Sequence, residues 1–127
     1  MNKSVTIDIW ETIIGEKNFS SLSKTRRELK YRYSYDYLLN FSKKIDYSKL
    51  VLAHDFVADE INKFSRFHSD KSFYDWVEIF INKIDKRLIT KLNPDAIISL
   101  GNVLDRAFLE HPPEIFDGTH ELLDFCR

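Results

Sequence analysis

The stretch Val5-Thr6-Ile7-Asp8-Ile9-Trp10-Glu11-Thr12 decides how the fold of this chain is interpreted. Its first residues are β-branched or apolar, which favours an extended strand, and the run ends in the carboxylate of Asp8. A strand that gives way to a turn at an acid places that acid at the carboxyl edge of a sheet, where open α/β sheets bind ligands. One strand cannot satisfy its own backbone groups, and the sequence after Thr12 offers no other convincing strand. We therefore expect the remaining strands of this sheet to be missing from the chain.

The composition fits one ordinary globular domain. The chain has 127 residues, of which 43% are apolar and 31% charged, and this excludes a disordered protein. The net charge of −1 gives no general attraction to nucleic acid or to a membrane surface, so neither is an expected partner. We expect no signal peptide and no membrane span, because Asp8 interrupts the first apolar run and no later run is long enough. Cys126 is the only cysteine, which predicts neither disulfides nor a thiolate metal site and favours a cytoplasmic location.

Four amphipathic helices with short connections are predicted after the opening strand, enough for a helical bundle. Ser21 or Ser23 is expected to cap the first helix, and Asn93 the fourth. Pro94 suits the first position of the fourth helix, where no amide partner is lost, and the prolines at 112 and 113 end that helix. The predicted helices cover residues 22–43, 48–66, 72–92 (starting after Asp70 or Ser72) and 94–111.

The first of these helices contains a conflicting pattern. Its tyrosines at positions 31, 33, 35 and 37 alternate with polar residues, which is the spacing of a strand. The flanking segments contain no turn residues, and this favours one continuous helix. The residues predicted on its buried stripe are Leu22, Leu29, Tyr33 and Tyr37.

The segment Asp8-Ile9-Trp10-Glu11-Thr12, together with the apolar strand before it, resembles the first motif of the haloacid dehalogenase (HAD) superfamily, Asp-x-Asp-x-Thr. Members of this superfamily mostly hydrolyse phosphate esters, a minority cleave carbon–halogen bonds, and many insert a helical cap after this motif. The resemblance implies a mostly α chain within a HAD-like, Rossmann-like α/β fold. It divides the chain into a first core strand and catalytic turn (1–17), a four-helix cap (18–111) and a truncated return to the core (112–127).

The resemblance also implies a role for three residues of the motif. Asp8 would be the catalytic nucleophile, and Thr12 would bind the phosphoryl group of the substrate. Mg²⁺ would be held by Asp8 and by the backbone carbonyl of Trp10, both of which are oxygen donors. The implied substrate is a small anionic molecule such as a phosphate ester, hydrolysed through an aspartyl intermediate.

Two departures from the HAD pattern qualify this function. Trp10 replaces the second Asp of the motif, which serves phosphatases as general acid/base, and dehalogenase-type members often carry an aromatic residue there. The later motifs, a Ser or Thr, a Lys or Arg and an acidic pair, are absent from this sequence. We therefore expect the chain to be inactive alone, with a companion chain or further polypeptide supplying the rest of the core. A carbon–halogen hydrolase and a non-enzymatic helical interaction module are the alternatives.

Other chemistry-bearing residues have simpler interpretations. The basic cluster Lys24, Arg26, Arg27, Lys30 and Arg32 could hold an anion, but such a run is usually a solvated helix face. The His54-Asp55 pair is similar to one found in metal-dependent phosphohydrolases, yet no histidine precedes it to complete that site. All four histidines are therefore expected to be structural or surface residues, and Cys126 to be inert.

Overall fold

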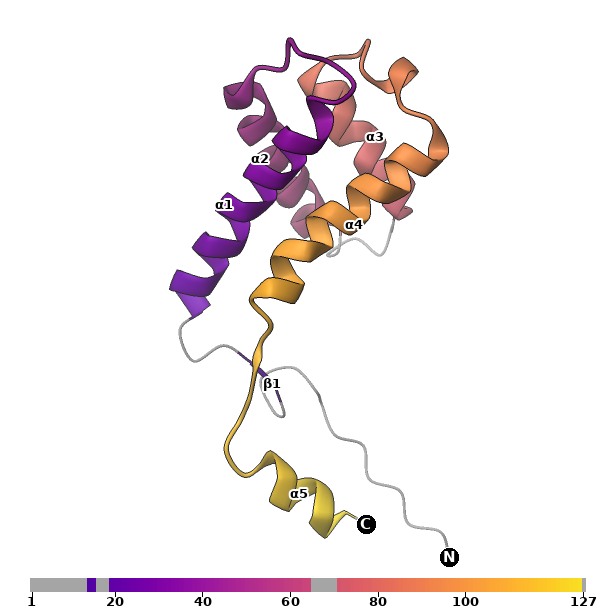
Figure 1. Ribbon diagram of the computed structural model, residues 1–127. Helices are drawn as coiled ribbons and strands as arrows, with labels where there is room; N and C mark the ends of the chain where they lie inside the picture. The colour runs from indigo at the N-terminus through magenta and orange to yellow at the C-terminus, as the bar shows by residue number, and fades with distance from the viewer. Residues whose placement is uncertain (1–13, 16–18, 65–70, 127) are drawn as a thin grey trace, which may run out of the picture.

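The computed structural model describes residues 14–15, 19–64 and 71–126 of the chain (Figure 1). Asp8, Trp10 and Thr12 lie outside the described residues, as does the whole predicted strand 5–12. The described part is mostly helical, as the sequence predicts. Its elements are β1 (Ile14–Gly15), α1 (Phe19–Leu38), α2 (Tyr47–Phe64), α3 (Phe73–Ile84), the 3₁₀ helix η1 (Ile89–Lys91), α4 (Pro94–Glu110), β2 (Glu114–Ile115) and α5 (Thr119–Phe125).

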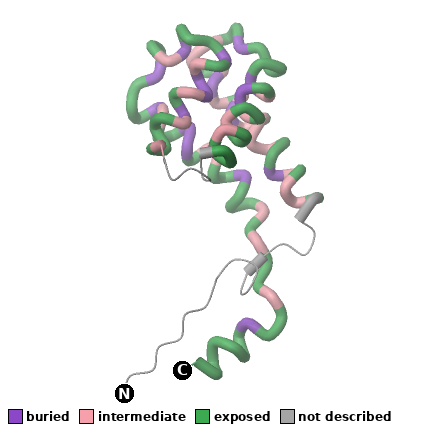
Figure 2. Tube along the Cα trace, turned by 180° about the vertical axis from the view of Figure 1, so that it is seen from behind, coloured by how far each residue is buried: buried purple, intermediate pink, exposed green. Residues whose placement is uncertain are grey.

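Helices α1 to α4 form a bundle in which α1 packs mainly along α4 and α2 mainly along α3. The centre of the bundle is aliphatic, and Figure 2 shows its buried residues concentrated between the helices. Burial of these side chains drives the helices together, with each buried Leu, Ile or Val contributing about 1.5–3 kcal/mol by transfer from water. The apolar residues with 2% exposure or less are Leu38, Leu50, Ala53, Ile81, Leu88, Leu100 and Ala107.

The alternating tyrosines lie within α1, so the helical interpretation of this segment is confirmed. Tyr31 and Tyr35, one turn apart, face α2: the Tyr31 hydroxyl donates to Asp55, and the Tyr35 ring meets Tyr47 edge-on. Tyr37 belongs to the other pair, and its hydroxyl donates to a backbone carbonyl of α4. The alternating tyrosines therefore lie on two faces of α1, one toward α2 and the other toward α4.

Two helix starts follow the predicted capping chemistry. Ser72 precedes α3 and forms a capping box, in which its hydroxyl accepts from the Asp75 amide while the Asp75 carboxylate accepts from the Ser72 amide. Asn93 precedes α4, and its side-chain oxygen accepts from the Ala96 amide at 2.8 Å. Pro94 occupies the first turn of α4 as predicted.

Two of the predicted helices have wrong limits, and the first helix also ends early, at Leu38 rather than at 43. The helix predicted over 72–92 ends at Ile84, because Asp85 is extended and its carboxylate accepts from the Arg87 amide, a local bond that competes with the helix. Leu88 follows in a separate turn and is still buried. The first helix begins at Phe19, so Ser21 and Ser23 lie inside it rather than capping it.

Two short strands join the ends of the bundle. β1 precedes α1, β2 follows α4, and they pair antiparallel with Ile14 opposite Ile115 and Gly15 opposite Glu114. The chain therefore enters and leaves the bundle at adjacent points (Figure 1). We call this end of the bundle, where Ile14–Gly15 pairs with Glu114–Ile115, the neck. The sequence did not indicate β2, because two residues are too few to show an alternating pattern. They form a strand only by pairing with β1.

Helix α5 extends beyond the neck, away from the bundle (Figure 1). It starts after Gly118, whose φ of +83° is readily adopted only by a residue without a side chain. Figure 2 shows α5 mostly exposed, and Phe125 at its end is 89% exposed. None of the helices described between residues 19 and 125 combines the length and the apolar character needed to cross a bilayer.

Candidate ligand-binding pocket

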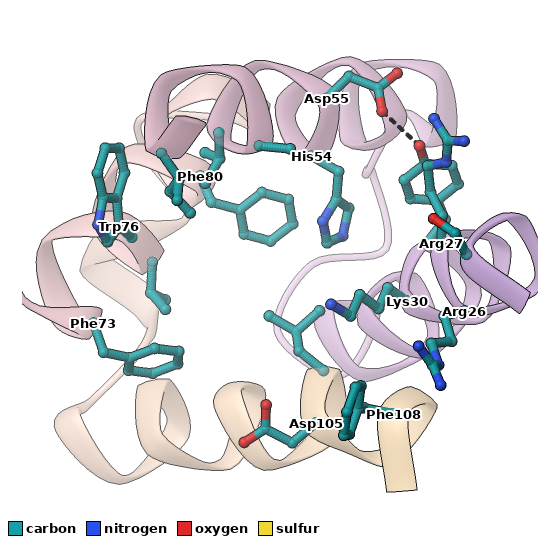
Figure 3. A pocket seen from close by; sticks show the side chains of 17 residues that line it. Arg26, Arg27, Lys30, His54, Asp55, Phe73, Trp76, Phe80, Asp105 and Phe108 are labelled. Atoms are coloured by element: carbon teal, nitrogen blue, oxygen red, sulfur yellow. Dashed lines mark hydrogen bonds between the residues drawn. The ribbon is translucent and has the colours of Figure 1, made fainter. Parts of the chain in front are cut away.

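A cavity of about 650 Å³ lies at the neck end of the bundle, where all four long helices contribute to its wall. Its lining residues fall within 23–31 of α1, 54–61 of α2, 73–80 of α3 and 104–108 of α4. This volume falls within the range of about 300–1,000 Å³ that is usual for small-molecule sites. Figure 3 shows the side chains around it.

One side of the cavity is aromatic. Phe73, Trp76 and Phe80 come from α3 at helical spacing, and Figure 3 shows the Phe73 and Phe80 rings directed inward. The Phe73 ring passes over Gly101 of α4, where an added Cβ would meet Phe73 Cζ at 2.5 Å. A residue without a side chain at 101 therefore allows α3 and α4 to approach closely enough to shape this wall.

The opposite side is cationic and comes from α1. Arg26 is buried at 8% exposure, and its Nε donates to the His111 carbonyl at 2.7 Å while its guanidinium lies 4.6 Å from the Phe108 ring centre. The prediction that the basic cluster is simply a solvated face was therefore wrong for Arg26. This contact could not be predicted from local sequence, because 85 residues separate Arg26 from its carbonyl partner.

Lys30 is the cation that points into the cavity (Figure 3). Its side chain is half-buried, and none of the ion pairs that join two described residues includes Lys30. Arg27 lies instead at the rim, where its charge acts on the Tyr31 hydroxyl. Among the residues that the structure describes, the carboxylates lining the cavity are those of Asp55 and Asp105.

His54 projects from α2 into the same space, between Phe80 (ring centres 4.3 Å apart) and Tyr31 (5.2 Å apart). Burial, reinforced by the Lys30 charge, lowers the pKa of His54 to about 4, so the imidazole is neutral at pH 7. The His54 Nε2 atom lies 2.8 Å from the Ser34 hydroxyl oxygen. The Ser34 hydroxyl donates to the Lys30 carbonyl at 2.6 Å, which assigns the proton of this contact to His54 Nε2 and leaves Nδ1 as an acceptor.

Ser34 and His54 do not form a nucleophile and its base. The Ser34 side chain has 0% exposure, and its proton is already engaged by a backbone carbonyl. The Asp55 carboxylate accepts from the Tyr31 hydroxyl at 2.6 Å instead of orienting His54. Burial and then Asp55 raise the pKa of Tyr31 to about 12, which keeps the phenol protonated. The geometry thus equips the pocket for binding rather than for covalent chemistry.

The residues predicted from the first motif stay untested by this geometry, because Asp8, Trp10 and Thr12 are outside the described ranges. His54 was expected to be structural or on the surface, and it contributes to the pocket wall. Within residues 14–15, 19–64 and 71–126, no group of three or more His, Cys, Asp or Glu side chains is placed to hold a metal ion. The signals that could have revealed the pocket, Lys30, His54 and Phe73, lie on three helices and share no sequence motif.

No family model matches the chain, and comparisons with curated proteins and with solved structures gave no match. Function is therefore inferred from the neck, the pocket and the residues of the opening strand.

Proposed function

We propose that this chain is the N-terminal part of a HAD-type hydrolase, with the bundle of α1 to α4 as its cap. The supporting observation is the pairing of β1 with β2, which places the two ends of the bundle side by side. A cap inserted into a core domain needs adjacent ends, because both of its linkers start from the same core. The pocket also lies in the half of the bundle nearer the neck, because its wall includes the residues 23–31 of α1 and 104–108 of α4.

The proposed reaction is hydrolysis of a phosphate ester. A carboxylate oxygen of Asp8 attacks phosphorus and the alcohol leaves; water then hydrolyses the aspartyl phosphate, which restores the carboxylate and releases phosphate. Thr12 would hydrogen-bond the phosphoryl oxygens. The carboxylate of Asp8 and the backbone carbonyl of Trp10 are oxygen donors of the kind Mg²⁺ prefers, and the ion would supply positive charge to the phosphoryl group.

The indole N–H of Trp10 is too weak an acid to protonate the leaving oxygen in place of the missing Asp, so that proton would come from another donor such as water. Substrates with acidic alcohols, such as aryl phosphates, should therefore react fastest. The bundle would act as a lid that excludes bulk water from Asp8 during the reaction.

The remaining core would be supplied by further polypeptide, from the same gene product or from a companion chain. Support comes from apolar side chains left exposed around β2 and α5: Ile115, Leu122, Leu123 and Phe125 are each at least 38% exposed. Packing against a sheet and its helices would cover them.

The proposal is tested by reading all three frames past codon 127 and co-expressing with this chain any frame that encodes the missing Ser or Thr, Lys and acidic pair. We expect Mg²⁺-dependent hydrolysis of p-nitrophenyl phosphate by the assembled protein and none by the 127-residue chain. Asp8→Asn should abolish the activity, and Asp36→Asn, at an exposed carboxylate on α1, should leave it unchanged. Hydrolysis that survives Asp8→Asn would overturn the proposal.

The exposed apolar residues of α5 also support a second candidate, a non-enzymatic module that binds a partner protein through α5. This candidate predicts partner binding that Leu123→Asp abolishes, together with no hydrolysis in the assembled complex. The aromatic residue at Trp10 keeps dehalogenase chemistry as the alternative reaction of the hydrolase, and release of chloride from a 2-chloro acid would distinguish it.

A further inference from the structure

The pocket combines two kinds of surface that together select a ligand class. Its α3 side presents the rings of Phe73, Trp76 and Phe80, which favour a flat apolar group. Its α1 side presents the ammonium of Lys30. A cavity of about 650 Å³ has room for one small molecule that spans both sides.

The charge at the cavity favours an anion of low charge. Lys30 is half-buried beside the aromatic wall, where an opposite charge is attracted more strongly than in bulk water. Arg26 is held by its contacts with His111 and Phe108 and contributes a fixed positive charge nearby, and Arg27 adds another at the rim. Asp55 and Asp105 also line the cavity and would repel a dianion. These opposing charges suit a single carboxylate better than a doubly charged phosphate monoester.

Neither Asp55 nor His54 competes with a ligand for Lys30. The Asp55 carboxylate is engaged by the Tyr31 hydroxyl at 2.6 Å. Neutral His54 stands beside Lys30 and offers no negative charge.

We propose that this cavity binds a small aromatic monocarboxylate, with the carboxylate on the Lys30 ammonium and the ring against Phe73, Trp76 and Phe80. The binding site goes beyond the proposed hydrolase function and does not depend on it, because the residues assigned to the ligand lie on α1 and α3.

The test uses the 127-residue chain and calorimetric titration with three probes that share one ring and differ in charge. Phenylacetate is the anion, phenylacetamide the neutral analogue and phenethylamine the cation. We expect phenylacetate to bind at least tenfold more tightly than either analogue. Equal affinity for the three probes, or no binding of phenylacetate, 4-phenylbutyrate or indole-3-acetate, would overturn the proposal.

Variants locate the anion partner. Lys30→Met keeps the apolar stem and removes the charge, and it should weaken phenylacetate binding about tenfold while leaving phenylacetamide unchanged. Lys24→Met, at an exposed lysine on the same helix, should change neither affinity by more than about twofold. Circular dichroism of each variant verifies that the bundle is folded. Equal loss in both variants would show a general charge effect and refute the assignment to Lys30.

Two further readouts place the ligand inside the cavity. Phenylacetate should shift the ring resonances of His54 and leave those of His120, an exposed residue on α5, unchanged. Asp105→Asn removes a like charge from the wall and should tighten phenylacetate binding. Weaker phenylacetate binding in Asp105→Asn would contradict a bound anion beside this carboxylate and overturn the proposal.

Discussion

His54 should make the stability of the bundle sensitive to mild acid. Burial first, and then the Lys30 charge, lower the pKa of His54 in the folded chain from 6.5 to about 4. The unfolded chain therefore takes up a proton at a higher pH than the folded chain does. This contribution to stability is present above pH 6.5 and is lost as the pH falls through about 4.

The size of the effect follows from the pKa difference. At about 1.36 kcal/mol per pH unit, the full contribution has a ceiling of about 3 kcal/mol. Because folding is linked to protonation, the unfolding free energy should fall by about 2 kcal/mol between pH 7 and pH 5. At pH 5 the imidazole is protonated in the unfolded chain and still neutral in the folded chain. Carboxylates with lowered pKa values, such as Asp75, add their own acid sensitivity at lower pH.

The assay is urea unfolding followed by circular dichroism at pH 7, 6 and 5. Wild type should lose about 2 kcal/mol of unfolding free energy across this range, and His54→Gln should lose much less. His120→Gln, which alters an exposed histidine, is the matched control and should behave as wild type. Equal acid sensitivity in wild type and His54→Gln would refute the reasoning, as would an NMR titration of the His54 ring with a midpoint near 6.5.

Three further changes probe the contacts that shape the bundle. Ser72→Ala removes the capping box of α3 and should lower the unfolding free energy by about 1 kcal/mol in urea titrations. No change would show that the capping box does not contribute to stability. Arg26→Met should cost about 2 kcal/mol, because its charge-assisted bonds to the His111 carbonyl are lost, and a neutral result would contradict the buried contact. Gly101→Ala gains about 1 kcal/mol of helix propensity but must displace the Phe73 ring. It should therefore shift the Phe73 ring resonances with little net change in stability, and unshifted resonances would contradict the close approach.

Local signals predicted the helical elements well where the chemistry acts within a few residues. Asn93 accepts from an amide three positions on, and the bond requires no distant partner. The capping box of Ser72 is equally local. The end of the third helix was predicted wrongly although its cause is also local. The Arg87 amide donates to the Asp85 carboxylate and ends the helix, but apolar residues continue at helical spacing past this point and led to a longer predicted helix.

The pocket was not predicted, because its residues are brought together only by packing. The sequence placed the apolar face of α3 in the core, but Phe73 is 50% exposed and forms the cavity wall. The basic cluster of α1 looked uniform, yet its members differ: Arg26 is buried, Lys30 points into the cavity and Arg27 lies at the rim. Periodicity identifies which residues share a helix face, and it does not identify what that face meets.

The sequence by itself determined a mostly helical chain, its four long helices and two of their caps, since each depends on neighbours along the chain. Tertiary structure alone decided the pairing of Ile14 with Ile115, the burial of Arg26 and the position of His54 beside Lys30. The His54–Ser34 contact spans 20 residues, the Arg26–His111 contact spans 85, and the paired strands bracket the whole bundle. Such contacts form only after the helices have packed, because the free energy that places them comes from burying the shared core rather than from any local preference.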